Sequence, residues 1–538
     1  MKYLRKSLVI LLVLLLSASS VFANGSKEAA KSEPAQQTSE VKDPSKPYAG
    51  TKLTWWTKLN ANVSTTYPNL GDTPWAKYVQ EQTGIEIQFI HPTVGSESEK
   101  FAIMIASGDY PDIIEHTWTT YAGGPLAAIN DGVIINLDKY MKDDAPNFMK
   151  LMAENPDVDK MVKTSNGNYY CFPFLRGLKQ PNITQFSGGI VVRQDVLDEL
   201  NLERPETIEE WEVALRAFKE YGFEKPFVTR SEWMKDVWSP GFDNWGNFYV
   251  EDGVVKNGLI EDSRRAFLEK MNQWYAEGLI DRDYLVANKK SNQTDFTTGK
   301  AAACNAPFGQ GLGQYTQIMH DANPEITQED IRCTVPVTSG KGQNAKFSKM
   351  NQIYDNSGVS AAISTDCKNV EAAMWLLDWM YSEQGMLTCN FGIPGVSYEM
   401  IDGVPTYTEE VTNNPNMQFA NALAAYTRAS TSGVCVQDEE YIRQYYAQDN
   451  QKEALELSMK TDMGEHFFPP ISVADKHTDE YADIMSNVKT YSDEMEAQFI
   501  SGTVSLKEWD KYISQLKSFG IEKAIAMLQE AYDNYMSH

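Results

Sequence analysis

Aromatic side chains gather beside hydroxyl, amide and basic groups in three short segments of this 538-residue chain. The segments are WWTKLN (55–60), HTWTTYAGG (116–124) and YYCFPFLRG (169–177). A sugar ring presents one apolar C–H face that packs on an aromatic ring, and a rim of hydroxyls that needs donors and acceptors. The composition of these segments therefore favours carbohydrate binding. The alternative is that most of the rings fill the core, because large aromatic side chains dominate packing.

A fourth segment, DVWSPGFDNWGN (236–247), has the same mixture, and its proline and glycines favour a loop. Each aromatic ring in this segment either contacts the ligand or packs against the rest of the protein. From the four segments we predict a ligand-binding site that includes Trp55, Trp56, Lys58, Trp118, Tyr121, Phe172, Arg176, Trp238 and Trp245. On this prediction, Trp118→Ala or Trp56→Ala weakens sugar binding and leaves the fold intact.

The elements that must position these side chains alternate between strands and helices. Apolar periodicity predicts a strand at 52–56, a helix at 75–83, a strand at 85–90, a helix at 99–107 that ends near Gly108, and a strand at 112–115. This order predicts a mainly parallel sheet covered by helices on both faces. In such sheets, ligands bind outside the carboxyl ends of the strands, and there we expect the first three aromatic segments.

Catalytic motifs are missing from the sequence. It contains no GxSxG elbow, no Walker A loop, no HExxH and no EF-hand loop. Two carboxylates can make a glycosidase, but 74 acidic residues supply pairs everywhere, so such pairs carry little weight. We therefore predict a binding protein rather than an enzyme, with a secreted glycosidase or lyase as the remote alternative.

Histidine and cysteine are scattered, with six of each and no zinc-type spacing. We predict no metal site and no cofactor. The cysteines are either mostly buried thiols or form one or two disulfides, and their spacing does not assign pairs among Cys171, Cys304, Cys333, Cys367, Cys389 and Cys435.

An export signal opens the chain. Basic residues precede a nine-residue apolar run at 8–16, and small side chains suit cleavage near Ala23. Nine residues are fewer than the roughly 20 that span a bilayer. We therefore predict a signal peptide at 1–23, export to the periplasm, and a flexible polar linker at 24–50.

The charge of the chain limits its partners. Its formal net charge is −26, and loss of the three basic residues of the leader takes it to −29. Such a surface repels nucleic acid and anionic lipid. It also disfavours a strongly acidic ligand, unless a local basic patch reverses the field.

Several longer segments resemble the family 1 extracellular solute-binding proteins, the capture subunits of ABC importers. They are ASGDYPDII (106–114), the block 188–220 that begins GGIVVRQDVLDEL, GVSAAISTDCKNVEAAMWLLDWMYSEQGM (358–386), FGIPGVSYEMIDGVPTYTEE (391–410) and the tail from Ile471. Within the block 188–220, Thr207 and Glu210 have the spacing of a helix capping box.

The resemblance implies an α/β protein with the type II periplasmic-binding-protein fold, which has two lobes joined by a hinge, here with extra C-terminal helices. Lobe 1 would hold residues 51–172 and 355–460, and lobe 2 residues 176–340 and 461–538. A ligand that contacts both lobes only when they close shifts the population to the closed state. The monomeric protein would then deliver its solute to a permease in the inner membrane. A peptide or another non-sugar solute is the alternative ligand.

The resemblance also adds three residues to the predicted binding site, and it excludes a calcium site and a lipid anchor. Relatives place a stacking tryptophan near the position of Phe308, so we add Phe308, its neighbour Gln310, and Tyr398 from the segment 391–410. Long-oligosaccharide relatives have a calcium loop where this chain continues FEKPFVTR (223–230), so we expect no calcium there. Many relatives carry a lipid-anchored cysteine at the cleavage point. This chain has none, which predicts a protein without a lipid anchor.

Overall fold

A six-stranded sheet organises the first part of the protein. The computed structural model describes residues 43–354 and 359–537, so the predicted leader and most of the predicted linker lie outside the described residues. The sheet has the order β14–β4–β11–β3–β1–β2. Its strands are β1 (Lys52–Trp56), β2 (Glu86–Ile90), β3 (Ile113–His116), β4 (Phe172–Leu175), β11 (Ser360–Ile363) and β14 (Cys435–Val436). β1 is parallel to β2 and β3, whereas β11 runs antiparallel to its two neighbours.

The predicted helices between these strands are confirmed. α2 (Pro74–Thr83) begins at Thr73, whose hydroxyl caps the first turn, and ends at Gly84 in the left-handed region. α3 (Glu97–Ser107) ends at Gly108. Both ends use a glycine where a side chain would be strained.

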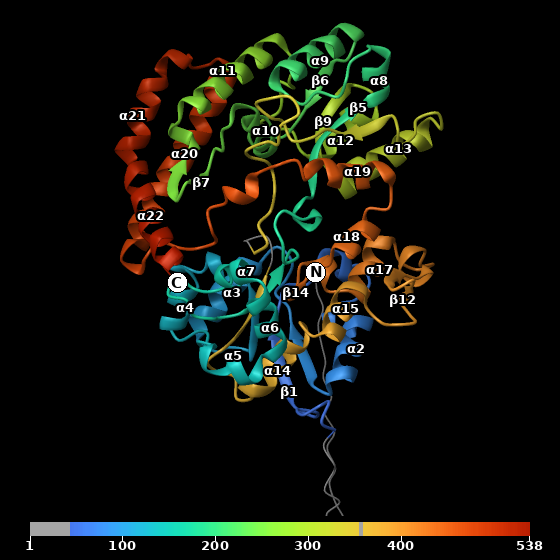
Figure 1. Ribbon diagram of the computed structural model, residues 1–538, viewed down its shortest axis with the longest axis vertical. Helices are drawn as coiled ribbons and strands as arrows, with labels where there is room; N and C mark the ends of the chain where they lie inside the picture. Colours follow the sequence, from blue (N-terminus) through green and yellow to red (C-terminus); the bar gives the residue numbers. More distant parts are fainter. Residues whose placement is uncertain (1–42, 355–358, 538) are drawn as a thin grey trace, which may run out of the picture. The chain divides into compact units, whose positions relative to one another are not determined.

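Further helices cover this sheet (Figure 1). They are α1 (Ala61–Ser64), α4 (Gly124–Asn130), α5 (Asp138–Asp144), α6 (Pro146–Glu154), α7 (Pro156–Met161), α14 (Val370–Trp379), α15 (Glu383–Phe391), α16 (Glu409–Thr412), α17 (Phe419–Tyr426) and α18 (Glu439–Tyr445), with the hairpin β12 (Tyr398–Ile401) and β13 (Val404–Tyr407) beside them. Asp378 of α14 accepts a hydrogen bond of 2.8 Å from the backbone N–H of Phe148, near the start of α6. A carboxylate at a helix N-terminus is favourable, so this contact joins the two helices.

A second sheet, of order β10–β5–β9–β6, organises the middle of the chain. Its strands are β5 (Gly188–Arg193), β6 (Lys225–Val228), β9 (Ala301–Pro307) and β10 (Ile331–Cys333). Around it lie α8 (Gln194–Glu199), α9 (Ile208–Tyr221), α10 (Ser231–Trp238), α11 (Asp262–Glu277), α12 (Lys289–Thr297), α13 (Gln314–Ala322) and the hairpin β7 (Phe248–Glu251) and β8 (Val254–Asn257). The predicted capping box of Thr207 and Glu210 is confirmed at the start of α9.

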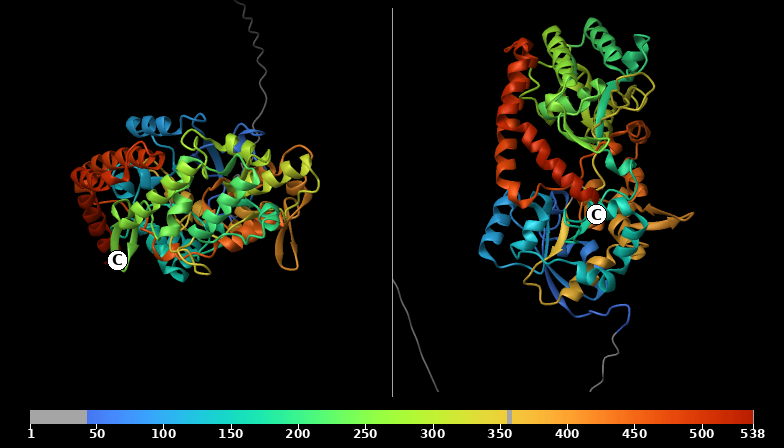
Figure 2. Two further views of the ribbon diagram at one scale, coloured as in Figure 1. Left: turned by 90° about the horizontal axis from the view of Figure 1, so that it is seen from above. Right: turned by 60° about the vertical axis from the view of Figure 1, so that its left-hand side comes forward.

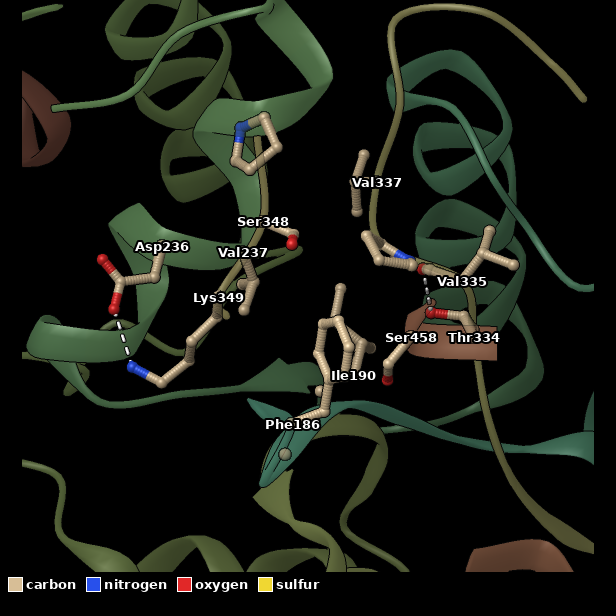
Figure 3. Close-up of a pocket in the computed structure, with 14 residues that line it drawn as sticks. Phe186, Ile190, Asp236, Val237, Thr334, Val335, Val337, Ser348, Lys349 and Ser458 are labelled. Carbon is tan, nitrogen blue, oxygen red and sulfur yellow. Dashed lines mark hydrogen bonds and ion pairs between the residues drawn. The ribbon is translucent and has the colours of Figure 1, made fainter. Parts of the chain in front are cut away.

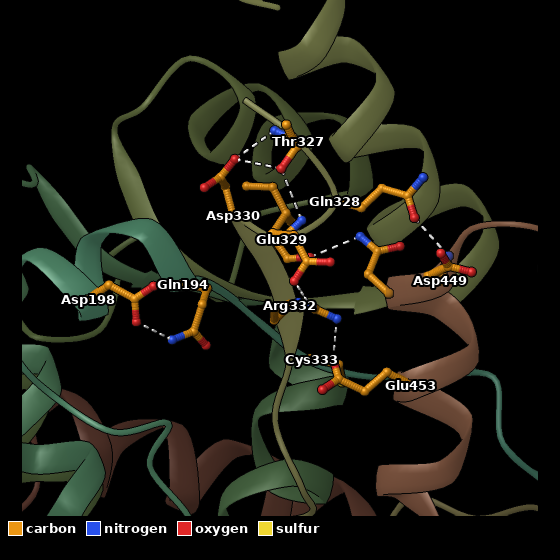
Figure 4. Close-up of polar contacts among 12 residues, drawn as sticks. Gln194, Asp198, Thr327, Gln328, Glu329, Asp330, Arg332, Cys333, Asp449 and Glu453 are labelled. Carbon is orange, nitrogen blue, oxygen red and sulfur yellow. Dashed lines mark hydrogen bonds and ion pairs between the residues drawn. The ribbon is translucent and has the colours of Figure 1, made fainter. Parts of the chain in front are cut away.

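The last third of the chain adds helices to the second sheet. α19 (Asp449–Ser458) contacts β10, and its Glu453 accepts hydrogen bonds of 2.9 Å from Arg332 and 2.8 Å from Arg204 (Figure 4). Paired charges at this interface satisfy a carboxylate that is partly buried. The lobe limits expected from the resemblance stay a prediction, and α19, which precedes the expected limit at 460, packs on the second sheet.

Three C-terminal helices follow, namely α20 (Thr478–Ser501), α21 (Trp509–Phe519) and α22 (Ile521–Ser537). α20 lies beside α11 (Figure 2), and fully buried Arg264 and Glu496 form a two-point ion pair between them, at 2.7 and 2.8 Å. Coulombic attraction from Arg264 and Lys235 lowers the pKa of Glu496 although burial opposes it. The pair therefore stays ionised inside a hydrophobic cluster.

The chain passes between the two sheets three times, through 176–187, 334–354 and 437–448. A small cavity of about 40 Å³ lies where residues of the first two segments meet the second sheet (Figure 3). Phe186, Ile190, Val237 and Val337 line it, together with Ser458 at the end of α19. These connecting segments correspond to the hinge that the resemblance implies.

The state of the cysteines, which the sequence left open, is settled by side-chain placement. All six cysteines are buried free thiols, so no disulfide forms. No helix within the described residues combines the length and the apolar character needed to cross a membrane.

Candidate functional site

A cavity of about 580 Å³ lies between the loop that follows β3 and the loop that precedes β7. Elements of both sheets and the C-terminal part of the chain contribute to it. Its lining comprises Thr119, Tyr121, Ala122, Gly123, Gly124, Trp245, Asn247, Phe248, Gln352, Met463, Phe467, Phe468, Pro469, Pro470, Ile471, Ser472, Val473, Thr478, Tyr481, Ala482 and Leu528.

The first wall comes from the loop after β3. Trp118–Thr120 form a 3₁₀ turn, and Tyr121 follows it with its ring half-buried. The Tyr121 hydroxyl donates a hydrogen bond of 2.9 Å to Asp131. Gly123 and Gly124 both have positive φ, and a Cβ at Gly124 would lie 2.6 Å from the Ser472 hydroxyl. Glycine is therefore required where this wall approaches the C-terminal segment.

The second wall comes from the loop before β7. The half-buried Trp245 stacks on Phe347, with the ring centroids 6.3 Å apart and an interplanar angle of 22°. Phe248 contacts Phe468 at a centroid distance of 6.4 Å. These aromatic contacts fix the orientation of the rings that border the cavity.

The third wall is the segment 463–473, which we call the crossing strap. Phe467 forms a β-bridge with Tyr249 of β7. Two side chains from the connecting segments hold the strap through its carbonyls, since Gln352 donates to Phe468 at 2.9 Å and Gln180 donates to Gly464 at 2.7 Å. The strap begins with a 3₁₀ turn at Met463–Glu465. Because Pro469 and Pro470 lack N–H groups, the residues after Phe467 continue without strand pairing.

The lining is aromatic, amide and hydroxyl in character. None of the described residues that line the cavity is Asp, Glu, Lys, Arg, His or Cys. Burial, and then the bond to Asp131, raise the pKa of Tyr121 to about 12, and burial raises the pKa of Tyr481 to about 12. Both phenols therefore remain protonated at neutral pH. The cavity can stack and hydrogen-bond a ligand, but its lining holds no acid–base pair for hydrolysis.

A second cavity, of about 890 Å³, adjoins the first, and Gln352, Phe467 and Pro469 line both. It extends from α7 to the end of α22, where Tyr532 and Tyr535 border it. Residues of the strap thus lie between two adjacent spaces of different composition.

Two of the predicted site residues, Tyr121 and Trp245, come together in the first cavity. Arg176 lines a smaller cavity, of about 160 Å³, beside the first connecting segment. Lys58 and Gln310 are exposed and line neither of the two larger cavities, and Gln310 accepts a hydrogen bond from Lys289.

The other seven predicted residues are buried in hydrophobic clusters and offer no surface to a ligand in this structure. They are Trp55, Trp56, Trp118, Phe172, Trp238, Phe308 and Tyr398. Their role in binding stays a prediction that this placement does not support.

The strand that contains Trp55 and Trp56 explains their burial. β1 continues through both residues, so their side chains point to opposite faces of the sheet, and helices cover each face. The Trp55 indole N–H donates a hydrogen bond of 2.9 Å to the Glu115 carboxylate. The ring centroids of Trp56 and Phe101 lie 5.9 Å apart. The strand predicted at 52–56 is confirmed, but sequence alone did not show that packing covers both of its faces.

Two loop tryptophans are buried for a different reason. The Trp118 indole finds a buried acceptor, the carbonyl of Ser360 at 3.1 Å, and has no exposed surface. Trp238 ends α10 and packs edge-on against Trp211 and Trp274, at 5.2 and 5.0 Å. A large ring near the end of an element gains more from such contacts than from exposure.

The remaining three sit in smaller packing contacts. Phe172 lies within β4, and Phe308 meets Tyr446 edge-on at 6.1 Å. Tyr398 begins the β12–β13 hairpin and packs on Phe391 at 6.0 Å.

Sequence reasoning missed most of the crossing strap. Phe467, Phe468 and Tyr481 were not among the predicted residues, nor were Asn247, Phe248 and Gln352. The run FFPP at 467–470 is the signal that could have found the strap, because two aromatic residues before two prolines cannot continue a helix.

A cavity bordered by two α/β sheets that the chain crosses three times defines a solute-binding protein of the periplasmic-binding-protein class. The comparison with families agrees with this class. Residues 62–387, more than half of the chain, match the family described as bacterial extracellular solute-binding protein. The chain belongs to this family, and the fold expected from the resemblance is confirmed.

Named relatives match over most of their length. Lipoprotein LipO of Bacillus subtilis (strain 168) is 25% identical over 493 residues, which cover 86% of this chain and 89% of LipO. The fructooligosaccharide ABC transporter substrate-binding protein FusA of Streptococcus pneumoniae serotype 4 (strain ATCC BAA-334 / TIGR4) is 22% identical over 486 residues, 86% of each chain. The crystal structure of the alginate-binding protein AlgQ2 without calcium ion has a TM-score of 0.69 at 23% identity and covers 90% of this chain and 98% of AlgQ2.

Proposed function

We propose that this protein captures a carbohydrate in the cavity between Tyr121, Trp245 and the crossing strap, and delivers it to an ABC transporter permease. The single observation that carries the proposal is the lining, in which half-buried aromatic rings lie among aliphatic, amide and hydroxyl side chains. This combination suits a ligand with apolar ring faces and many hydroxyls. The names of FusA and AlgQ2, which refer to fructooligosaccharide and alginate, support the same ligand class.

Binding without turnover is the second part of the proposal. Hydrolysis of a glycosidic bond by the usual route needs two carboxyl groups at the scissile bond. The described lining supplies none, and the family is one of solute-binding proteins. Within the described residues, no group of three or more His, Cys, Asp or Glu side chains could hold a metal ion, so no metal-assisted route is proposed.

Export without a lipid anchor is the third part. It depends on the leader, which lies outside the described residues, and the relative LipO is a lipoprotein by name. Labelled fatty acid supplied to the growing host cells tests it. We expect no label on the mature protein, and incorporation of label contradicts this part alone.

The central experiment identifies the ligand. Protein purified from its native host is unfolded, and mass spectrometry identifies the released small molecules. A thermal-shift panel then compares sugars with peptides, since a ligand at 100 times its dissociation constant stabilises the protein by about 2.7 kcal/mol. We expect an intact sugar that is recovered unchanged after incubation. A retained peptide contradicts carbohydrate capture, and a shortened sugar contradicts binding without turnover.

A further inference from the structure

The main cavity is uncharged although the protein around it is strongly acidic. The chain carries a formal net charge of −26, yet the described lining residues include no ionisable group except the phenols of Tyr121 and Tyr481. A charged side chain also contacts the lining, because Asp131 accepts the hydrogen bond from Tyr121. A ligand in this cavity therefore meets amide, hydroxyl, backbone and aromatic groups.

The physical cost of an anionic ligand in such a place is large. A carboxylate that leaves water needs a cation or several converging N–H donors to replace its hydration. The lining has no Lys or Arg, and the crossing strap presents two prolines, which have no N–H, among its residues. The Asp131 carboxylate would repel the anion further.

The side chains that line the adjoining cavity also disfavour an anionic ligand. Four carboxylate side chains line it, Glu154, Asp157, Asp462 and Glu465, against the two ammonium groups of Lys160 and Lys179. Lys160 already lies over the Tyr535 ring, at 5.2 Å, and donates to the Met536 carbonyl at 3.4 Å. A ligand that extends past the strap thus enters a space with an excess of negative charge, which disfavours anions.

We propose that the ligand is an uncharged oligosaccharide, without uronate, sulfate or phosphate groups, and that the uncharged lining selects it. The inference rests on the proposed function and narrows it to a substrate class. The two adjacent cavities suit a ligand of more than one sugar unit.

Calorimetric titration of the mature protein with matched ligands tests the inference. The matched pair is an oligogalacturonate of one length, as the free acid and as the full methyl ester, which differ in charge but not in linkage. Neutral fructo-, galacto- and manno-oligosaccharides complete the panel, each measured with and without calcium ions. We expect the tightest ligand to be neutral, the ester to bind at least about tenfold more tightly than the acid wherever either binds, and the affinity to be insensitive to salt.

Each result of these titrations supports or contradicts one stated claim. An anionic glycan as the tightest ligand, or a free acid that equals its ester, overturns the inference and leaves carbohydrate capture standing. If a neutral glycan binds and neither member of the matched pair does, the inference is supported. If no glycan binds while a peptide does, the proposed function itself fails.

A pair of variants shows whether the lining is responsible. Asn247→Lys places a cation in the lining, and Asn487→Lys places the same charge on the exposed surface of α20, away from both cavities. We expect Asn247→Lys to reduce the preference for neutral over acidic ligands by about threefold or more, and Asn487→Lys to leave it unchanged. An unchanged preference in Asn247→Lys, with the fold intact by circular dichroism, contradicts selection by the lining.

Discussion

Two loops of this protein each send one aromatic side chain into the core and another into the cavity. In the loop after β3, Trp118 is fully buried whereas Tyr121 borders the cavity, and in the segment after α10 the same contrast separates Trp238 from Trp245. The buried rings lie next to a regular element and find partners there, such as the Ser360 carbonyl for Trp118. The cavity rings lie a few residues further along the loop. In these two segments, therefore, the aromatic ring that lies further along the chain lines the cavity and the earlier one packs in the core.

The largest expected effect comes from removing one of the two buried tryptophan rings. Trp238→Ala removes a ring that packs edge-on against Trp211, Trp274 and Phe227, and leaves a void. We expect the free energy of unfolding to fall by about 3–5 kcal/mol, measured by urea denaturation. Trp118→Ala should behave in the same way. A full-stability Trp118→Ala protein with weakened sugar affinity would instead support the role predicted from sequence.

The next largest effect comes from removing an aromatic ring that lines the cavity. Trp245→Ala removes a half-buried ring from the lining, so sugar affinity should fall by roughly 10- to 100-fold in calorimetric titration, with a much smaller change in stability than for Trp238→Ala. Trp245→Phe, which keeps a ring, is the matched control and should recover most of the affinity. If Trp245→Ala binds like the wild type, the cavity is not the ligand site.

A smaller effect tests whether the loop after β3 must approach the crossing strap closely. Gly124→Ala and Gly132→Ala both place a Cβ at positive φ, which costs about 1–2 kcal/mol. Only the Cβ at position 124 meets a neighbour, the Ser472 hydroxyl, whereas the one at 132 has open space. We expect both variants to lose similar strain energy in thermal unfolding, and only Gly124→Ala to lose further stability and affinity. Equal behaviour in both assays would show that the wall and strap do not need close approach.

A separate effect depends on pH and concerns His116, the last residue of β3. Burial, and then the charge of Lys58, lower the pKa of His116 from 6.5 to about 4, and its ring stacks on Phe101 at 3.7 Å. The unfolded chain therefore takes up a proton before the folded one does, so stability should fall as pH decreases from 6.5 to about 4 and level off below. His116→Phe keeps the stacking and should reduce this decline in denaturation curves. An identical pH profile would contradict the assigned pKa.

Much of the fold could be predicted because local signals agree with it. Apolar periodicity, the glycines after α2 and α3, and the capping box of Thr207 with Glu210 each determine an element without help from distant residues. The strand order of the first sheet was harder to predict. Nothing local indicates that β11, almost 250 residues after β3 in the chain, inserts beside it in the antiparallel sense.

The site could be predicted only in part because exposure is a tertiary property. Tyr121 and Trp245 were found among twelve predicted residues since both belong to aromatic loops. Sequence reasoning predicted the strand through Trp56 but could not tell that both of its faces are covered, or that a strap around Phe467 returns to β7 and lines the cavity. Both facts depend on contacts between residues that are far apart in the sequence.

The most direct measurement of the central claim is a crystal structure of the protein with its retained natural ligand. The account predicts an intact, uncharged sugar in the cavity, with ring faces on Trp245 or a neighbouring aromatic and hydroxyls within hydrogen-bond distance of Gln352, Asn247 or Thr119. A ligand bound elsewhere on the protein, or a charged or non-sugar molecule between Tyr121 and the crossing strap, would contradict it.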